Sequence, residues 1–201
     1  MIAPKTVYEG CKYVYPNMPN RAYFGTPFFE QLDRDKRYVA EVKRNGWRCL
    51  VLKLGHLELW TRYGTLIQTT KNSTLDGIRN SLRNIPDNSL LDGELLDRRT
   101  KDIKDVYYVF DILWWNGVKI WSEPLWQRRK ILESVIQPND HICIPEQFRV
   151  GRKFLYLQAI QGGDEGIVFK RLDSPYIIGS TKCLKNPHWI KIKKDEKHFV
   201  A

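Results

Sequence analysis

Residues 37–61 read RYVAEVKRNGWRCLVLKLGHLELWT. Three short runs of β-branched, aromatic and other apolar residues are separated here by turn formers, first Asn45-Gly46 and then Gly55. This spacing predicts an antiparallel meander of three strands. Side chains alternate between the two faces of a strand, so Glu41 and Lys43 share one face of the first strand, beside a glycine turn.

The same alternation pairs charged residues elsewhere. In WIKIKK it places the amines of Lys191 and Lys193 on one face, about 7 Å apart along the strand. In LLDGELL it places Asp92 and Glu94 together, around a glycine that allows a close approach to the backbone. Half-exposed antiparallel strands commonly show such alternation, so each pair taken alone is weak evidence for a site.

Outside residues 37–61, helical and strand patterns alternate along the chain. Helical spacing covers 74–83, 123–136 and 152–160, and the second helix has Ser122 as its expected N-cap and Pro124 in its first turn. Five further strands are expected, at 90–96, 106–115, 141–148, 165–170 and 189–194. The pattern predicts an α+β fold with antiparallel sheets, and shows no internal repeat.

The two remaining segments are expected to be irregular. Residues 1–36 are rich in Tyr, Phe, Pro and Asn, which favours an aromatic segment that wraps the domain. Residues 171–187 are polar and proline-containing, which favours a long loop. We therefore expect one domain over 1–201, with 37–194 as its core.

Composition limits the classes of protein that this chain can belong to. It has 201 residues, 42% of them hydrophobic, which is enough for a substantial core. The longest apolar run, 106–115, is too short to span a bilayer and contains Asp111. No secretory signal or zinc-type Cys/His spacing is present, so an intracellular protein without a membrane anchor is expected. The formal net charge of +10 suits a nucleic-acid partner.

Five motifs and one supporting segment occur in a fixed order along the chain. They are KRNGWR at 43–48, TRYG at 61–64, LDGE at 91–94, FDIL at 110–113 followed by Asn116-Gly117, EGIV at 165–168 and WIKIKKD at 189–195. From Lys43 to Lys194 the sequence resembles the nucleotidyltransferase domain of ATP-dependent DNA ligases. Asn45 stands where that family more often has aspartate. The resemblance implies two packed antiparallel sheets flanked by helices, an ATP-grasp-like nucleotidyltransferase fold.

The resemblance also implies a reaction centre at Lys43. This lysine would attack the α-phosphate of ATP to form lysyl-AMP, which requires a neutral amine. Lys191, Lys193 and a divalent metal would supply the positive charge that favours the neutral amine and stabilises the phosphate oxygens. Arginine would fail at position 43, because a guanidinium does not lose its proton.

The remaining site residues follow from the same resemblance. Glu41 would accept a hydrogen bond from the adenine amino group, Phe110 would stack on the base, and Glu94 and Glu165 would hold Mg²⁺ or Mn²⁺. Four further residues are expected to contact the nucleotide: Val42, Arg48, Arg62 and Lys185. Glu94 is expected to contact the sugar as well.

The resemblance further implies that AMP passes to the 5′-phosphate of a nick in duplex DNA, which the 3′-hydroxyl then seals. Such enzymes serve DNA replication, repair and recombination. No OB-fold domain lies within this chain, and residues 195–201 stand where one usually begins, so we expect a monomer that works with a further domain or a partner protein.

Three alternatives remain open at this point. RNA ligases share the lysine chemistry and are the second choice, which would make RNA-containing strands the substrate. The mRNA-capping guanylyltransferases share it too, but Glu41 and the WIKIKKD ending resemble DNA ligases more than capping enzymes. In a different class, the chain could be a non-catalytic nucleic-acid-binding module with the same fold.

Overall fold

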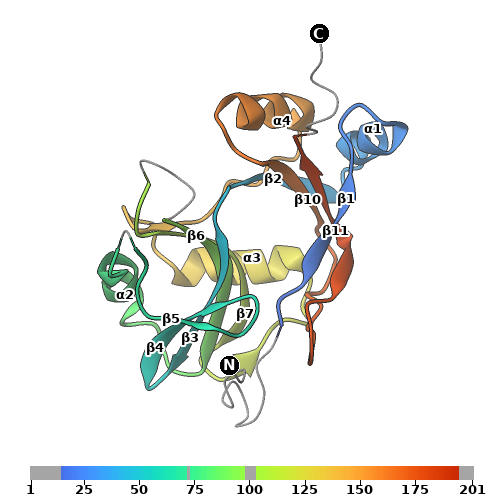
Figure 1. Cartoon of the computed structure of the whole chain (residues 1–201). Helices are drawn as coiled ribbons and strands as arrows, with labels where there is room; N and C mark the ends of the chain where they lie inside the picture. Colours follow the sequence, from blue (N-terminus) through green and yellow to red (C-terminus); the bar gives the residue numbers. More distant parts are fainter. Residues whose placement is uncertain (1–14, 72, 98–102, 195–201) are drawn as a thin grey trace.

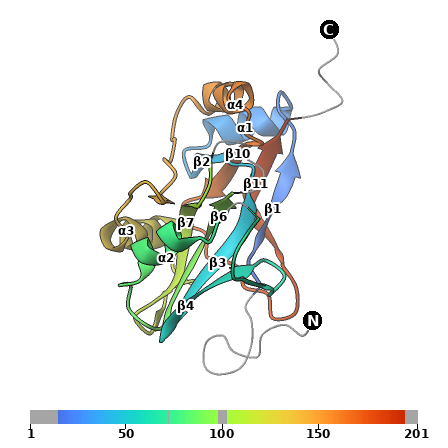
Figure 2. The same cartoon turned by 60° about the vertical axis from the view of Figure 1, so that its left-hand side comes forward.

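Two β-sheets form the centre of the molecule, and helices cover their outer faces (Figures 1 and 2). The computed structural model describes residues 15–71, 73–97 and 103–194. Within these ranges the strands are β1 (Met18–Ala22), β2 (Tyr38–Lys43), β3 (Trp47–Leu54), β4 (His56–Thr61), β5 (Leu66–Ile67), β6 (Ser89–Leu96), β7 (Val106–Trp115), β8 (Val118–Lys119), β9 (Ile142–Cys143), β10 (Gly166–Arg171) and β11 (Lys185–Lys193). The helices are α1 (Pro27–Arg34), α2 (Asp76–Leu82), α3 (Leu125–Val135) and α4 (Arg152–Gln161). The predicted α+β class is confirmed.

The smaller sheet has four strands in the order β1-β11-β10-β2. β10 pairs antiparallel with both β2 and β11, whereas β1 lies parallel to β11 at the edge. The expectation of purely antiparallel sheets is therefore wrong at β1, and also at β9, which runs parallel to β7 in the other sheet. Both exceptions are short edge pairings.

The prediction of an irregular segment over 1–36 is also wrong for much of its length, because β1 and α1 lie within it. α1 begins at a standard capping sequence: the Thr26 side chain accepts a hydrogen bond from the Phe29 N–H, and Pro27 occupies the first turn. The many aromatic residues around this capping sequence obscured the helix signal. Phe29 is buried in the hydrophobic cluster on the four-stranded sheet. Residues 1–14 lie outside the described part of the chain.

The larger sheet has the order β5-β4-β3-β6-β7-β8, with β9 beside β7. The hairpin between β3 and β4 is confirmed, with Gly55 at a φ of +70°. The predicted hairpin at Asn45-Gly46 is wrong, because β2 and β3 belong to different sheets and this segment crosses between them. A Cβ at Gly46 would lie 2.6 Å from the Leu95 carbonyl oxygen, so the glycine serves a close backbone approach and not a hairpin turn.

Other boundaries differ from the prediction in smaller ways. α3 has Pro124 and not Ser122 at its N-cap, with no side-chain capping bond. In 141–148 only Ile142–Cys143 is a strand, followed by a single bridge from Phe148 to Ala40. β11 starts at Lys185, inside the segment expected to be a loop. The other expected helices and strands lie within a few residues of their predicted bounds.

Three hydrophobic clusters hold these layers together. One packs α1 and α4 on the outer face of the four-stranded sheet, and another packs α2 and α3 on the outer face of the larger sheet. The third lies where Leu50, Leu113 and Trp189 meet, joining the larger sheet to β11. No helix in the described ranges is long and apolar enough to cross a bilayer.

Candidate active site

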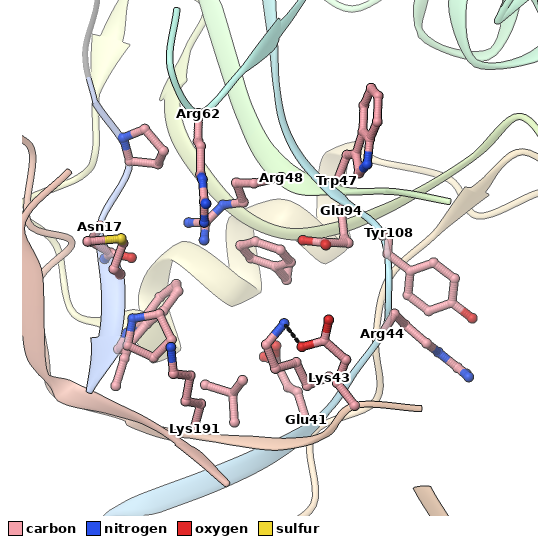
Figure 3. Close-up of a pocket in the computed structure, with 18 of the residues that line it drawn as sticks. Asn17, Glu41, Lys43, Arg44, Trp47, Arg48, Arg62, Glu94, Tyr108 and Lys191 are labelled. Carbon is pink, nitrogen blue, oxygen red and sulfur yellow. Dashed lines mark ion pairs between the residues drawn. The ribbon is translucent and has the colours of Figure 1, made fainter. Parts of the chain in front are cut away.

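A cavity of about 670 Å³ lies between the two sheets (Figure 3). Its volume falls within the usual range for small-molecule sites. The four-stranded sheet contributes Glu41, Lys43, Lys170, Lys191 and Lys193, and Glu165 directly precedes β10. The larger sheet and its connections contribute Arg48, Arg62, Glu94, Tyr108 and Phe110. Pro16 to Pro19, at the start of β1, close one side of the cavity.

Lys43 is the last residue of β2, and its Nζ lies 3.0 Å from Oε2 of Glu165 (Figure 3). Lys193 Nζ lies 2.7 Å from the same oxygen. The register explains this triad, since Gly166 is paired with Lys43 on one side and with Lys193 on the other. Burial acts to raise the pKa of Glu165, but the two lysines more than offset burial, so the pKa of this carboxyl lies below its ordinary value.

Lys191 faces the same part of the cavity from β11 and is partly buried. Its pKa is lowered, first by burial and then by the charges of Lys43, Lys193 and Arg21. Three ammonium groups and one carboxylate therefore form a region with a surplus of positive charge, which suits an oligophosphate.

Glu41 lies deeper in the cavity and is 3% exposed. Its Oε2 lies 2.6 Å from Lys170 Nζ, and its Oε1 accepts a hydrogen bond from Gln147 at 2.8 Å. Arg129 of α3 approaches to 4.0 Å. The carboxylate is thus held in place by a buried cation and a partly buried amide.

Arg48 is fixed by partners of its own on the opposite wall. Its guanidinium donates two hydrogen bonds to the fully buried Asp92 carboxylate and a third to the Tyr176 hydroxyl. Tyr176 also donates to Asp92. The guanidinium lies 4.7 Å from the centre of the Phe110 ring, so the arginine and the aromatic ring are held as a unit.

Glu94 and Arg62 complete this wall. Burial raises the pKa of Glu94, while Lys43 and Arg48 act in the opposite direction. Arg62 is exposed at the rim and stacks on the Tyr63 ring at 4.6 Å. Phe110 meets the Trp189 ring edge to face at 6.2 Å.

The structure therefore brings together nearly all of the site residues expected from the sequence. Val42 lines the cavity too. Lys185 does not: it is exposed at the start of β11, outside the residues that line the cavity. Among described residues no group of three metal-ligating side chains is preassembled, but the Glu94 and Glu165 carboxylates both face the cavity. Two carboxylates beside a cluster of ammonium groups that suits phosphate fit Mg²⁺, which usually takes few protein ligands.

The comparison with known families agrees with this arrangement. Residues 96–193 match the family described as ATP dependent DNA ligase domain. Over this stretch, just under half of its length, the chain is similar to that family. The match covers three of the motif segments: FDIL, EGIV and the start of WIKIKKD.

Curated relatives and solved structures are similar to this chain as well. A DNA ligase of Saccharolobus islandicus (strain L.S.2.15) is 32% identical over 124 residues, which are 54% of this chain and 20% of that protein. A prophage-derived DNA ligase-like protein, LigB of Bacillus subtilis, is 25% identical over 79% of this chain and 62% of its own length. The chain thus spans a fifth to three fifths of these relatives.

Mycobacterial DNA ligase D, solved in complex with ATP and MES, has the same fold. The TM-score is 0.64 at 22% identity, over 89% of this chain and 60% of that one. The expected ligase nucleotidyltransferase fold is confirmed.

Several residues in and around the cavity were not anticipated from the sequence. Lys170 and residues 16–19 line it, and Gln147 and Tyr176 bind Glu41 and Asp92 from outside its lining. One signal was available for Lys170: alternation along β10 places it on the inner face with Val168, where a charged residue needs a buried partner. Gln147 and Tyr176 lie in loops, where no periodicity indicates the direction of a side chain.

Proposed function

We propose that this chain is the adenylation domain of an ATP-dependent DNA ligase, with Lys43 as the nucleophile. The observation that carries the proposal is the position of Lys43 Nζ. It lies in a cavity of ligand size, paired with Glu165 at 3.0 Å, with Lys191 and Lys193 on β11 of the same sheet. A lysine that is paired with a carboxylate and lies near other cations is well placed to attack a phosphate group.

In the proposed first step, Nζ of Lys43 attacks the α-phosphorus of ATP. An N–P bond forms, the bond from phosphorus to the pyrophosphate oxygen breaks, and Nζ releases a proton. The Lys43 side chain is 21% exposed, so this proton has a route to solvent. Lys191 and Lys193 stabilise the charge on the phosphate oxygens.

The remaining cavity residues position the nucleotide in this proposal. Phe110 stacks on the base, Glu41 accepts a hydrogen bond from the adenine amino group, and Arg48 and Arg62 contact the sugar and phosphates. Glu94 and Glu165 would hold Mg²⁺ or Mn²⁺, which neutralises phosphate charge when bound. Lys185 lies outside this set and is expected to contribute little.

Later steps are proposed for nicked duplex DNA. AMP would pass from Lys43 to the 5′-phosphate of the nick, and the 3′-hydroxyl would then displace AMP and seal the strand. The net charge of +10 supports a nucleic-acid acceptor. Efficient sealing is expected to need a further domain or partner protein that encloses the duplex.

The first experiment is incubation with α-labelled ATP and Mg²⁺, followed by denaturing electrophoresis and intact mass. We expect a covalent AMP adduct in the unaltered protein and none in Lys43→Ala or Lys43→Arg, whereas Lys53→Ala, a lysine of β3 outside the cavity lining, should still be labelled. Protein preloaded with AMP is then offered nicked DNA or nicked RNA. Salt-sensitive DNA binding without labelling would instead favour the non-catalytic binding module.

A further inference from the structure

The pair of Glu41 and Lys170 is buried more deeply than the other charges that line the cavity. Glu41 is 3% exposed and Lys170 is 2% exposed. The two side chains come from adjacent strands: Val168 of β10 is paired with Glu41, and Lys170 points to the same face two residues further on. The distance of 2.6 Å from Nζ to Oε2 makes this a direct ion pair.

Aromatic rings hold the ammonium group of Lys170 on its other sides. Nζ lies 4.5 Å from the centre of the Phe110 ring and 4.3 Å from the centre of the Trp189 ring. Burial lowers the pKa of Lys170, and Glu41 and Asp111 act in the opposite direction, while Arg48 adds to the lowering. The amine of Lys170 therefore contacts Glu41 and the two rings, unlike Lys43 and Lys193, which contact Glu165.

The groups that face Glu41 can be named from each neighbouring element. They are Lys170 from β10, Gln147 from the segment after β9, and Arg129 from α3 at 4.0 Å. Lys170 is the cation in direct contact. A carboxylate this deeply buried is costly to keep charged without such a partner.

The charge of Glu41 decides which purine it accepts. An ionised carboxylate only accepts hydrogen bonds, whereas a protonated carboxyl group also donates one. A 6-aminopurine such as adenine presents a donor at position 6, and a 6-oxopurine such as guanine presents an acceptor there. An anionic Glu41 therefore favours adenine, and a protonated Glu41 loses that preference.

We propose that Lys170 is a positioning residue for nucleotide specificity, which keeps Glu41 anionic and thereby restricts the site to 6-aminopurine nucleotides. This inference rests on the proposed function, because it assumes that Glu41 meets the base. It adds a determinant of specificity that lies outside the motif lysines of β2 and β11.

The test is the ratio of ATP to GTP efficiency in forming the adduct, measured for Lys170→Met over a range of pH. Methionine keeps the length and packing of the side chain but removes the charge. The ATP to GTP ratio is expected to fall about tenfold or more, since a charged hydrogen bond is lost. The half-saturating ATP concentration should rise, with little change in the maximal rate. The preference should recover as pH rises and the Glu41 carboxyl loses its proton.

Three further variants separate this role from a general loss of stability. Lys170→Arg keeps the charge and should restore the preference for ATP. Gln147→Leu removes an uncharged donor to Glu41 and should keep a preference that does not vary with pH. Glu41→Gln combined with Lys170→Met leaves no buried charge in the pair, so it should fold and show no purine preference at any pH.

Equilibrium binding of ATP and GTP without metal, followed by tryptophan fluorescence, supplies a second readout that needs no covalent step. A preference for ATP that Lys170→Met leaves unchanged at every pH would overturn the inference. Absence of an adduct in the unaltered protein, together with purine selectivity in binding that depends on Lys170, would instead overturn the proposed catalytic function alone.

Discussion

The two walls of the cavity both present cations but use different residues to do so. The four-stranded sheet presents Lys43, Lys191 and Lys193, of which the first and last share one carboxylate oxygen of Glu165. The larger sheet presents Arg48, which is bound to the buried Asp92 and to Tyr176. One wall holds two lysines in ion pairs with a single carboxylate, and the other holds an arginine in a hydrogen-bonded network.

This difference separates chemistry from positioning. A lysine can lose a proton and change partner, which a nucleophile and its neighbours must do. An arginine with a bidentate partner keeps both its charge and its orientation, which suits a residue that fixes a substrate. We call the side of the cavity that carries Arg48 the arginine wall, and the side that carries Lys43, Lys191 and Lys193 the lysine wall. Substitutions on the arginine wall should mainly lower stability, and those on the lysine wall should mainly lower the rate of adenylation.

The largest effect on stability is expected for Arg48→Met. It leaves the fully buried Asp92 carboxylate without its cation, which should lower the free energy of unfolding by about 3 to 5 kcal/mol. The matched control is Arg62→Met at the exposed rim, with an expected loss below about 0.5 kcal/mol. Urea unfolding measures both. Equal losses would show that the arginine wall does not differ from an ordinary surface.

On the lysine wall, Lys191→Met should lower the rate of adduct formation about 100-fold, because one group that stabilises the phosphate charge is removed. Its stability should change little, since the pKa of this partly buried lysine is already lowered by burial and by neighbouring cations. Lys185→Met, on the same strand but outside the cavity, is the control and should retain its rate. A comparable loss at Lys185 would return that residue to the site.

A smaller effect is expected for Tyr176→Phe, which removes one hydroxyl from the network around Asp92. The free energy of unfolding should fall by about 1.5 kcal/mol, the contribution of a hydrogen bond to a charged group. Tyr63→Phe removes a hydroxyl that contacts Arg62 at the surface and should be nearly neutral. An unchanged urea midpoint for Tyr176→Phe would mean that Arg48 and Asp92 hold each other without the tyrosine.

The smallest effect concerns an ion pair outside the cavity, between Arg37 and Asp35 just before β2. The hydrogen bonds from the Arg37 side chain lower the pKa of Asp35 to about 2. Because the pKa is lowered in the folded state, the resulting stability is present above the ordinary value of 3.8 and is lost as pH falls toward 2. NMR titration of Asp35 should show this midpoint, and Arg37→Met should return it to near 3.8. An unshifted midpoint in the unaltered protein would contradict the pairing.

The parts of this molecule that the sequence predicted well are those with short-range signals. Strand alternation placed Glu41 with Lys43 and Lys191 with Lys193, and these pairs do face one cavity. The predictions that were wrong concern the pairing of strands that lie far apart in the sequence. Asn45-Gly46 has the local chemistry of a hairpin, but β2 pairs with β10, more than a hundred residues away, and nothing local indicates this.

The partners of the site residues were harder to predict than the site residues themselves. Gln147 reaches Glu41, and Tyr176 reaches Asp92, from segments without regular structure. A loop side chain has no period from which its direction can be inferred, so these contacts become visible only when the tertiary structure is known.

The strand order of the smaller sheet has a consequence for how the protein is made. The larger sheet takes its strands from residues 47–143, a continuous stretch, whereas the smaller sheet joins residues 18–43 to residues 166–193. Joining distant segments carries a high loop-closure cost, so the smaller sheet should form late. During synthesis from the N-terminus, the larger sheet can assemble while β1 and β2 still await their partners. Lys43 therefore acquires its neighbours Glu165 and Lys193 only after residues 165–193 have left the ribosome, and the nucleotide site that we propose cannot be complete before then.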